Sequence, residues 1–409
     1  MLASFTNTLT PKLRPVDAQP FVQNGEPALL LRDPLQLSGN YLVLPRELGP
    51  VLGLFDGARD LGGIRSAFTM RYGSKVPSDL LQQLVAVLDD NYMLDNERSA
   101  GAHQRSLEAY RQAPFRPPMM AGQSYPAEPS ALRRLFDTYL DRVNGVGSGP
   151  AYCHGVISPH IDYHRGGLVY AAVWKQAKEM ARAADLVVLL GTDHYSMGDR
   201  LTLTRQSYAT PYGVLPTDTD IVDALVEAIG EEEAFAGELR NRSEHSLELV
   251  ATWLHHMRGG EPVSMVPILT GSFADFILDR GEPAVDAMLA AFLDTLGRQI
   301  AGRKVLVIAS GDLSHVGPAF GGAAVDAKSR ARIKAADDEL MQQMAQGSAE
   351  GFFAAIRRDR DRNNVCGVSP FYLMLRLLGD VEGHILAYDQ CPADQMNTSL
   401  VSVCGMVFG

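Results

Sequence analysis

The second half of the chain alternates between short runs of apolar residues and longer stretches in which apolar residues recur every three or four positions. The short runs cover 155–158, 186–190 and 304–310. Runs of this length and composition are typical of strands that are buried on both faces of a parallel sheet. The pattern therefore predicts three interior strands.

The longer stretches predict amphipathic helices around these strands, at 132–143, 221–229, 247–257 and 285–296. The run 265–269 is a further candidate strand, although Pro267 within it argues against an interior position. Strands that alternate with helices indicate a three-layer α/β domain. We expect a mostly parallel sheet with helices on both faces, extending from 119 to 409.

Residues 1–95 carry a different pattern and are predicted to form a separate small α+β domain. Two short strands are expected at 28–31 and 41–44, and three helical patterns follow at 48–55, 61–68 and 80–88. Two strands and three helices in this order are typical of a winged-helix domain. The stretch 54–88 resembles the small peptide-recognition domains typified by the pyrroloquinoline-quinone chaperone family, which implies a peptide partner. The alternative is a packing or dimerisation appendage.

Residues 96–118 are predicted to link the two domains. This segment is polar and charged, and it ends in Pro114, Pro117 and Pro118. Such a composition is typical of a connecting segment with little structure of its own.

Composition excludes several classes of function. The formal charge is 37 − 48 = −11 and basic residues form no block, which argues against a nucleic-acid or acidic-membrane binder. No apolar run reaches the roughly 18–20 residues that a membrane span requires, and the first 15 residues show no signal peptide. Four cysteines in 409 residues form no disulfide framework, so we expect reduced thiols and a cytoplasmic protein.

Histidines follow all three predicted interior strands. His160 ends the first, His194 comes three residues after Gly191, and His315 follows the third together with Asp312. Functional crevices of open α/β sheets lie at the carboxyl ends of the strands, so these side chains are expected to converge. Imidazole is a ligand for zinc, copper or iron and needs a hydrogen-bond acceptor to fix its tautomer.

Cys366 is the cysteine best placed for chemistry. It precedes the apolar helical run 371–378, where a helix N-terminus would lower the pKa of a thiol. The alternative is an inert, packed cysteine. His245 is a further candidate, because its position at the start of the helix at 247–257 is not explained by capping.

These residues belong to a series of short motifs whose order resembles the Memo family, known in bacteria and archaea as component B of the AmmeMemoRadiSam system. The motifs are Ala121-Gly122 with Tyr125-Pro126, Ser158-Pro159-His160, Leu190-Gly191-Thr192-Asp193-His194, Glu244-His245-Ser246, Ser310-Gly311-Asp312-Leu313-Ser314-His315 and Cys366-Gly367. The family's fold is similar to that of the class III extradiol dioxygenases of the LigB type, which are non-haem iron enzymes. The resemblance also implies a radical-SAM protein and other members of that system as partners.

The resemblance implies a metal ion held by His160, His194 and Cys366. His315, oriented by Asp312, would act as acid and base, and His245 would line the pocket. A thiolate would replace the third, carboxylate ligand of the dioxygenases, which favours copper or a redox-active iron and makes ring cleavage less expected. Tyr195 stands where many family members have a second histidine.

Three hypotheses follow. The first is a metal-dependent redox enzyme or metalloprotein that uses iron or copper. The second is a non-catalytic module that binds a peptide or protein in the same cleft, with residues 1–95 recognising a peptide. The third is a structural zinc site, but a closed site of that kind usually has four protein ligands and several cysteines.

Overall fold

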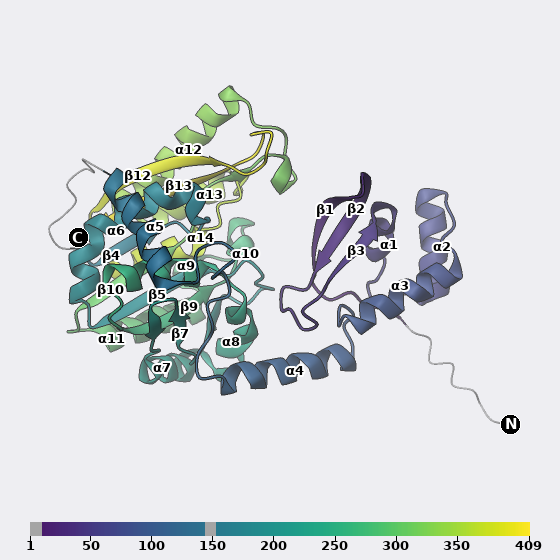
Figure 1. The fold of residues 1–409 in the computed structure, drawn as a ribbon, viewed down its shortest axis with the longest axis horizontal. Coiled ribbons are helices and arrows are strands. Elements are labelled where there is room, and N and C mark those ends of the chain that lie inside the picture. The colour runs from purple at the N-terminus through teal and green to yellow at the C-terminus, as the bar shows by residue number, and fades with distance from the viewer. Residues whose placement is uncertain (1–9, 144–152) are drawn as a thin grey trace. The chain divides into compact units, whose positions relative to one another are not determined.

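A computed structural model describes residues 10–143 and 153–409, and the chain divides into two compact units, 1–112 and 113–409 (Figure 1). Part of the N-terminal stretch on which the absence of a signal peptide was predicted therefore lies outside the described residues. Within the described ranges, no helix combines the length and the apolar character that crossing a bilayer requires.

The first unit contains a three-stranded antiparallel sheet in the order β1 (Asp17–Gln23), β2 (Glu26–Arg32) and β3 (Tyr41–Pro45). The two predicted strands are β2 and β3. The pattern missed β1, which pairs with β2 through a two-residue turn at Asn24 and Gly25, both with positive φ. Asn-Gly is the strongest short-range cue for such a hairpin, so the information was present in the sequence.

Helices follow the sheet of the first unit. They are η1 (Arg46–Leu48), α1 (Gly49–Leu52), α2 (Leu61–Tyr72), α3 (Ser78–Asp90) and α4 (Glu97–Gln112). The segment 96–118, expected to be a linker, thus contains a 16-residue helix that clusters with the first unit. Only Ser99, Ala102 and Tyr110 of α4 are buried, so the helix has almost no apolar stripe for a pattern to detect.

The second unit is built on an eight-stranded sheet with the path β11-β13-β4-β10-β5-β9-β6, and β12 pairs with β13. The four central strands are parallel: β4 (Gly155–Ser158), β10 (Val305–Ser310), β5 (Leu186–Thr192) and β9 (Ser264–Thr270). The flanking strands are antiparallel to their neighbours: β6 (Leu201–Leu203), β11 (His315–Val316), β12 (Gly383–Pro392) and β13 (Leu400–Phe408). Strands β7 (Tyr208–Thr210) and β8 (Gly213–Leu215) form a separate hairpin.

Helices cover both faces of this sheet, so the predicted α/β architecture is confirmed. One hydrophobic core lies under α5 (Pro129–Arg142), α6 (Tyr163–Ala183) and α9 (Ser246–Met257). The other lies under α7 (Thr219–Ile229), α11 (Ala287–Ile300), α12 (Ala327–Ala345), α13 (Ala349–Arg358) and α14 (Val368–Leu378). Short helices α8 (Glu231–Phe235) and α10 (Ala274–Ile277) complete the second layer.

Pro267 does not keep β9 out of the sheet interior, contrary to the expectation. The main-chain N–H of Met265 points away from β5 and donates to Pro216, so the nitrogen of Pro267, two residues on, points the same way. The neighbouring strand β6 pairs only with residues 268–270. Pro267 therefore lies beyond the end of β6 and interrupts no hydrogen bond of the ladder.

Candidate metal centre

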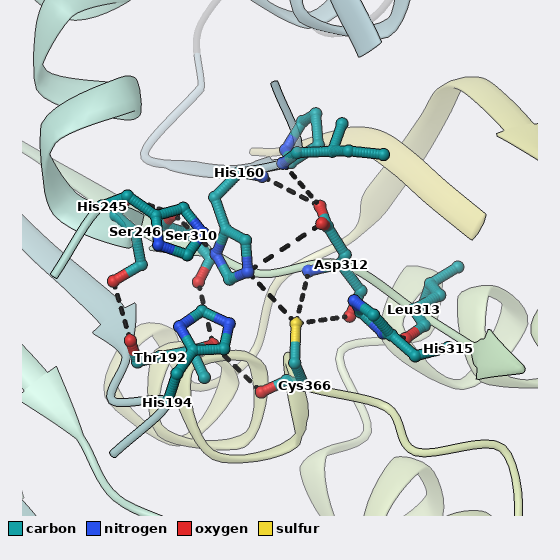
Figure 2. A network of polar contacts seen from close by, with 12 residues as sticks. His160, Thr192, His194, His245, Ser246, Ser310, Asp312, Leu313, His315 and Cys366 are labelled. Carbon is teal, nitrogen blue, oxygen red and sulfur yellow. Dashed lines mark hydrogen bonds and ion pairs between the residues drawn. The ribbon is translucent and has the colours of Figure 1, made fainter. Parts of the chain in front are cut away.

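The carboxyl ends of three adjacent central strands bring the predicted histidines together. Ser310 at the end of β10 pairs with Ser158 of β4 on one side and with Gly191 of β5 on the other, so the three strands end at the same level. His160 and His194 follow two of these ends, and their ring centroids lie 4.9 Å apart (Figure 2).

His245 joins them from a different element. It is the N-cap residue of α9, and its ring centroid lies 4.7 Å from that of His194 and 5.3 Å from that of His160. The structure therefore gathers three imidazoles at one edge of the sheet.

One buried carboxylate fixes two of the three imidazoles. Glu244 is 1% exposed, and its Oε1 lies 3.0 Å from Nδ1 of His194 and 3.1 Å from Nδ1 of His245. It also accepts the main-chain N–H groups of His194, His245 and Ser246 at 2.8–3.1 Å. An acceptor at Nδ1 favours the tautomer that carries its proton there, so Nε2 holds the lone pair whenever the ring is neutral.

Ser310 favours the same tautomer in the third imidazole, that of His160. Its hydroxyl donates to the carbonyl of Ser246 at 2.6 Å, so the oxygen is an acceptor towards Nδ1 of His160 at 3.3 Å. Nε2 of His160 then faces Cys366 and Asp312 (Figure 2). All three imidazoles thus have Nδ1 bound to an acceptor and Nε2 left for a ligand.

The charges of the cluster depend on burial and on Glu244. Burial, together with the neighbouring imidazoles, lowers the pKa of His160 well below its usual value. Burial opposes a charge on His194 as well, but Glu244 and Cys366 outweigh it and raise the pKa of His194. The carboxyl of Glu244 keeps a pKa well below the usual value despite burial, because His194 and His245 stabilise its charge.

Cys366 lies next to His160, just before α14. Its Sγ is 3.2 Å from Nε2 of His160 and accepts the main-chain N–H of Asp312 at 3.2 Å. A nitrogen and a sulfur bound to the same ion lie about 3.1–3.6 Å apart, given metal–N near 2.05 Å and metal–S near 2.3 Å. The observed separation suits a shared metal. Burial dominates over the expected effect of the helix terminus and raises the pKa of the Cys366 thiol in the metal-free protein.

The loop that carries Cys366 approaches β10 closely because two glycines face each other. A Cβ added to Gly311 would lie 2.6 Å from Cα of Gly367, and one added to Gly367 would lie 2.3 Å from the ring of Phe371. A side chain at Gly311 would therefore require a shift of the backbone, and one at Gly367 would displace the ring of Phe371. The two glycines of the Gly-Asp and Cys-Gly motifs therefore set the distance between Cys366 and the strand ends.

Asp312 and His315 are both at the site, but they are not paired as expected. Oδ1 of Asp312 accepts the main-chain N–H of His160 at 2.9 Å and that of Ile161 at 3.3 Å. Nδ1 of His315 instead lies 3.1 Å from each of the carbonyls of Leu313 and Asn364. The prediction that Asp312 orients His315 is therefore wrong in this structure, because two backbone carbonyls fill that role.

The surroundings set the protonation of both residues. Burial raises the pKa of Asp312 to about 6 and lowers the pKa of His315 to about 4. Because two carbonyls accept the proton on Nδ1 of His315, the neutral ring keeps its free lone pair on Nε2. His315 is thus a neutral proton acceptor at pH 7.

The histidines of the site and Asp312 line one cleft of about 420 Å³. Its polar lining includes the three histidines of the cluster, Asp312, His315 and Arg165. Its apolar lining includes Met120, Leu249, Phe320 and Val401. A cleft of this size and composition suits a small molecule with an apolar body, held next to a polar reactive group.

A buried ion pair that the sequence did not reveal supports the loop of Glu244 and His245. Arg116 is fully buried and forms an ion pair with Glu248, in the first turn of α9. Its other nitrogens donate to the carbonyls of Asn241 at 2.7 Å and Glu244 at 2.9 Å. The cue was weak: a glutamate, Glu248, within an otherwise apolar helical pattern.

Glu248 also holds the segment that leads into α5. Its carboxylate accepts the hydroxyl of Tyr125 and the main-chain N–H groups of Met119 and Met120, the latter two at 2.9 and 2.8 Å. Met120 lines the cleft. The ion pair therefore connects one wall of the cleft to the residues that orient the histidines.

Among the described residues, two sets of donors lie close enough together to hold an ion, with all donor atoms of a set within 4.8 Å of one another. One set is His160, His194 and His245, and the other is His160, Asp312 and Cys366. The set implied by the resemblance, His160, His194 and Cys366, draws on both. His245, which was expected to line the pocket as a catalytic residue and not to bind the ion, thus offers a ligand atom as well.

The fold and the site define an α/β protein with a candidate metal centre at the carboxyl edge of its sheet. The model of the family described as "Memo-like protein" matches residues 116–407. The chain therefore belongs to the Memo family.

Relatives with the description "MEMO1 family protein" extend the match. One from Aquifex aeolicus (strain VF5) is 28% identical over 407 residues, which cover 98% of this chain and 100% of its own. One from Methanopyrus kandleri is 30% identical over 287 residues, with 67% and 91% covered. One from Thermus thermophilus is 26% identical over 331 residues, with 81% and 93% covered. The similarity to the Aquifex protein thus spans both units.

Proposed function

We propose that this protein binds one redox-active transition-metal ion, iron or copper, in the cleft and acts as a metal-dependent redox enzyme or metalloprotein. The observation that supports the proposal best is the common state of His160, His194 and His245. Each has an acceptor at Nδ1, which leaves Nε2 as the ligand atom, as in imidazole ligands of metals. A structural role would not require a carboxylate shared between two imidazoles.

His160 is the shared ligand, with His194 beside it and Cys366 or His245 completing the set. A mixed imidazole and thiolate set suits copper and iron, and zinc is a further possibility. The bound ion would supply electron transfer and Lewis acidity. Asp312 holds the backbone of His160, and His315 accepts a proton on Nε2 from a substrate in the cleft.

Metal analysis of protein purified without chelators and without added metal tests the proposal, followed by spectroscopy of the bound ion. We expect about one ion per chain in the wild type and loss of that ion in His160→Asn. His384→Asn is the matched control, since His384 lies on β12 and does not line the cleft. Equal metal content in all three proteins would contradict the proposal.

The second candidate is a binding module in which the first unit recognises a peptide. Its sheet exposes large apolar side chains, with Phe21 42%, Val22 66% and Tyr41 67% exposed. Such residues suit an apolar partner surface. Titration of the protein with peptides encoded beside its gene, and with the radical-SAM protein of the same system, tests this alternative. Binding that Tyr41→Ser weakens, without any metal-dependent turnover, would favour it over the enzyme.

A further inference from the structure

A second cavity of about 450 Å³ lies in the same unit as the metal cleft. One of its walls is a face of α12, formed by Ser329, Arg332, Ile333 and Ala336. Their spacing of three, one and three residues places them on one side of the helix. The opposite walls come from the segment 316–325 and from the loop around Asn363.

The two cavities share a wall that is one layer of chain thick. His315 and Val316 are consecutive residues of β11, and successive side chains of a strand point to opposite faces. His315 lines the metal cleft and Val316 lines the second cavity. The same chain continues with Phe320 in the metal cleft and Val325 in the second cavity.

The loop on the other side connects the two cavities in the same way. Asn363 lines the second cavity, and its carbonyl accepts the main-chain N–H of His315 at 2.7 Å. The next residue, Asn364, has a positive φ of 50°, and its carbonyl accepts from Nδ1 of His315. Cys366 follows two residues later. A shift at Asn363 would therefore move the groups that hold His315 and Cys366.

The second cavity has an apolar floor, and its polar lining comprises one carboxylate, Asp359, and the donors of Ser329, Arg332, Arg362 and Asn363. Val316, Val325 and Ile333 belong to one apolar cluster. Arg332 donates to the hydroxyl of Ser329 at 3.0 Å. Hydrogen bonds from Ser329, and to a smaller extent the charge of Arg332, lower the pKa of Asp326. Within the described part of the chain, Arg332 forms no ion pair. The carboxamide of Asn363 likewise has no hydrogen-bond partner among the described residues.

The second basic residue of the cavity is already neutralised. Arg362 forms an ion pair with Asp359 at 3.1 Å. Arg332 is thus the cation left for an incoming anion, in a protein whose net charge is −11.

We propose that this cavity binds a small amphipathic carboxylate. The carboxylate would bind Arg332 and the amide of Asn363, and the hydrocarbon part would cover Val316, Val325 and Ile333. Pockets of roughly 300–1,000 Å³ hold such ligands. The bound molecule restrains Asn363 and, through it, the loop that carries Cys366, so the site regulates access to the metal cleft.

The binding part of the proposal is tested on the metal-free full-length chain, so its result does not depend on the proposed function. Calorimetric titration with hexanoate is the measurement, and hexanamide is the uncharged counterpart. We expect saturable binding of hexanoate and about 10-fold or greater loss of affinity in Arg332→Gln, as for a lost charge-assisted hydrogen bond. Ala336→Phe should abolish binding by filling the cavity.

Lys328→Gln is the matched control, because Lys328 is an exposed cation of the same helix that does not line the cavity. It should bind hexanoate as the wild type does. The affinity of hexanoate for the metal cleft would not depend on Arg332. Equal affinity in the wild type, Arg332→Gln, Ala336→Phe and Lys328→Gln would therefore overturn the proposal. Absence of saturable binding up to about 10 mM hexanoate, or equal binding of hexanamide, would overturn it as well.

The coupling part uses the thiol of Cys366 as a reporter. The other three cysteines are buried, whereas Cys366 is partly accessible. We expect saturating hexanoate to slow alkylation of Cys366 by iodoacetamide at least threefold in the wild type and to leave the rate unchanged in Arg332→Gln. An unchanged or faster rate in the wild type would show that the cavity does not restrain this loop.

Discussion

Replacement of Glu244 by glutamine removes one charge and one acceptor from the centre of the histidine cluster and leaves the volume almost unchanged. In the wild type, Oε1 and Oε2 together accept five hydrogen bonds or contacts, from two imidazoles and three main-chain N–H groups. A glutamine keeps one oxygen. Its amide group, placed at the other position, would face N–H donors.

The expected cost follows from this geometry. A buried donor without an acceptor costs about 1–3 kcal/mol, and loss of the group that orients a ligand histidine typically lowers metal affinity about 10–100-fold. The first figure is a loss of folding stability, whereas the second corresponds to about 1.4–2.8 kcal/mol of metal-binding free energy. We therefore expect the metal affinity of Glu244→Gln to fall by about 10–100-fold.

Competition with a chromophoric chelator measures the affinity, and thermal unfolding of the metal-free protein checks that the variant folds. Glu227→Gln is the control. Glu227 is exposed on α7, and its substitution removes the same charge at a position far from the cluster in the sequence. If a folded Glu244→Gln bound metal within about twofold of the wild type, the assignment of Nε2 as the ligand atom of His194 would be refuted.

Three other substitutions have expected results that a single measurement can contradict. Cys366→Ser should lower metal content or shift the spectrum of the bound ion while Cys404→Ser does not, because a hydroxyl is no soft donor; identical spectra would show that the sulfur is not a ligand. Because the folded state lowers the pKa of His315 to about 4, its contribution to stability is complete above pH 6.5 and is lost as the pH falls. Between pH 7 and 5, urea unfolding of the metal-free wild type should therefore lose up to about 2 kcal/mol more than that of His315→Gln, and parallel losses would contradict this. Arg116→Met should lower the free energy of unfolding by about 3–5 kcal/mol and weaken metal binding, and a neutral effect would show that Glu248 is held by its other donors.

The interior strands of the second unit and the residues at their ends could be predicted because the pattern that marks them is local. Apolar runs such as 186–190 are visible in the sequence, and the carboxyl ends of parallel strands meet at one edge wherever the helices lie. The positions of His160, His194 and Asp312 follow from this rule.

The parts that escaped prediction depend on contacts between distant residues. The ion pair of Arg116 and Glu248 joins positions 132 apart, and the only cue to it in the sequence is the place of Glu248 in an apolar helical pattern. Main-chain carbonyls orient His315, and since every residue type has one, the sequence does not indicate this orientation. Helix α4 was missed because it buries only Ser99, Ala102 and Tyr110, which leaves almost no apolar stripe for a pattern to detect.

The buried ion pair of Arg116 and Glu248 has a practical consequence for expression of the second unit alone. The sequence pattern suggested a fragment that starts at Met119, which would lack Arg116 and leave the carboxylate of Glu248 beneath the surface without its counter-charge. A fragment that starts at Ala113, where the unit begins, retains the arginine. The six residues 113–118 thus separate a fragment in which Glu248 keeps its buried counter-charge from one in which it does not.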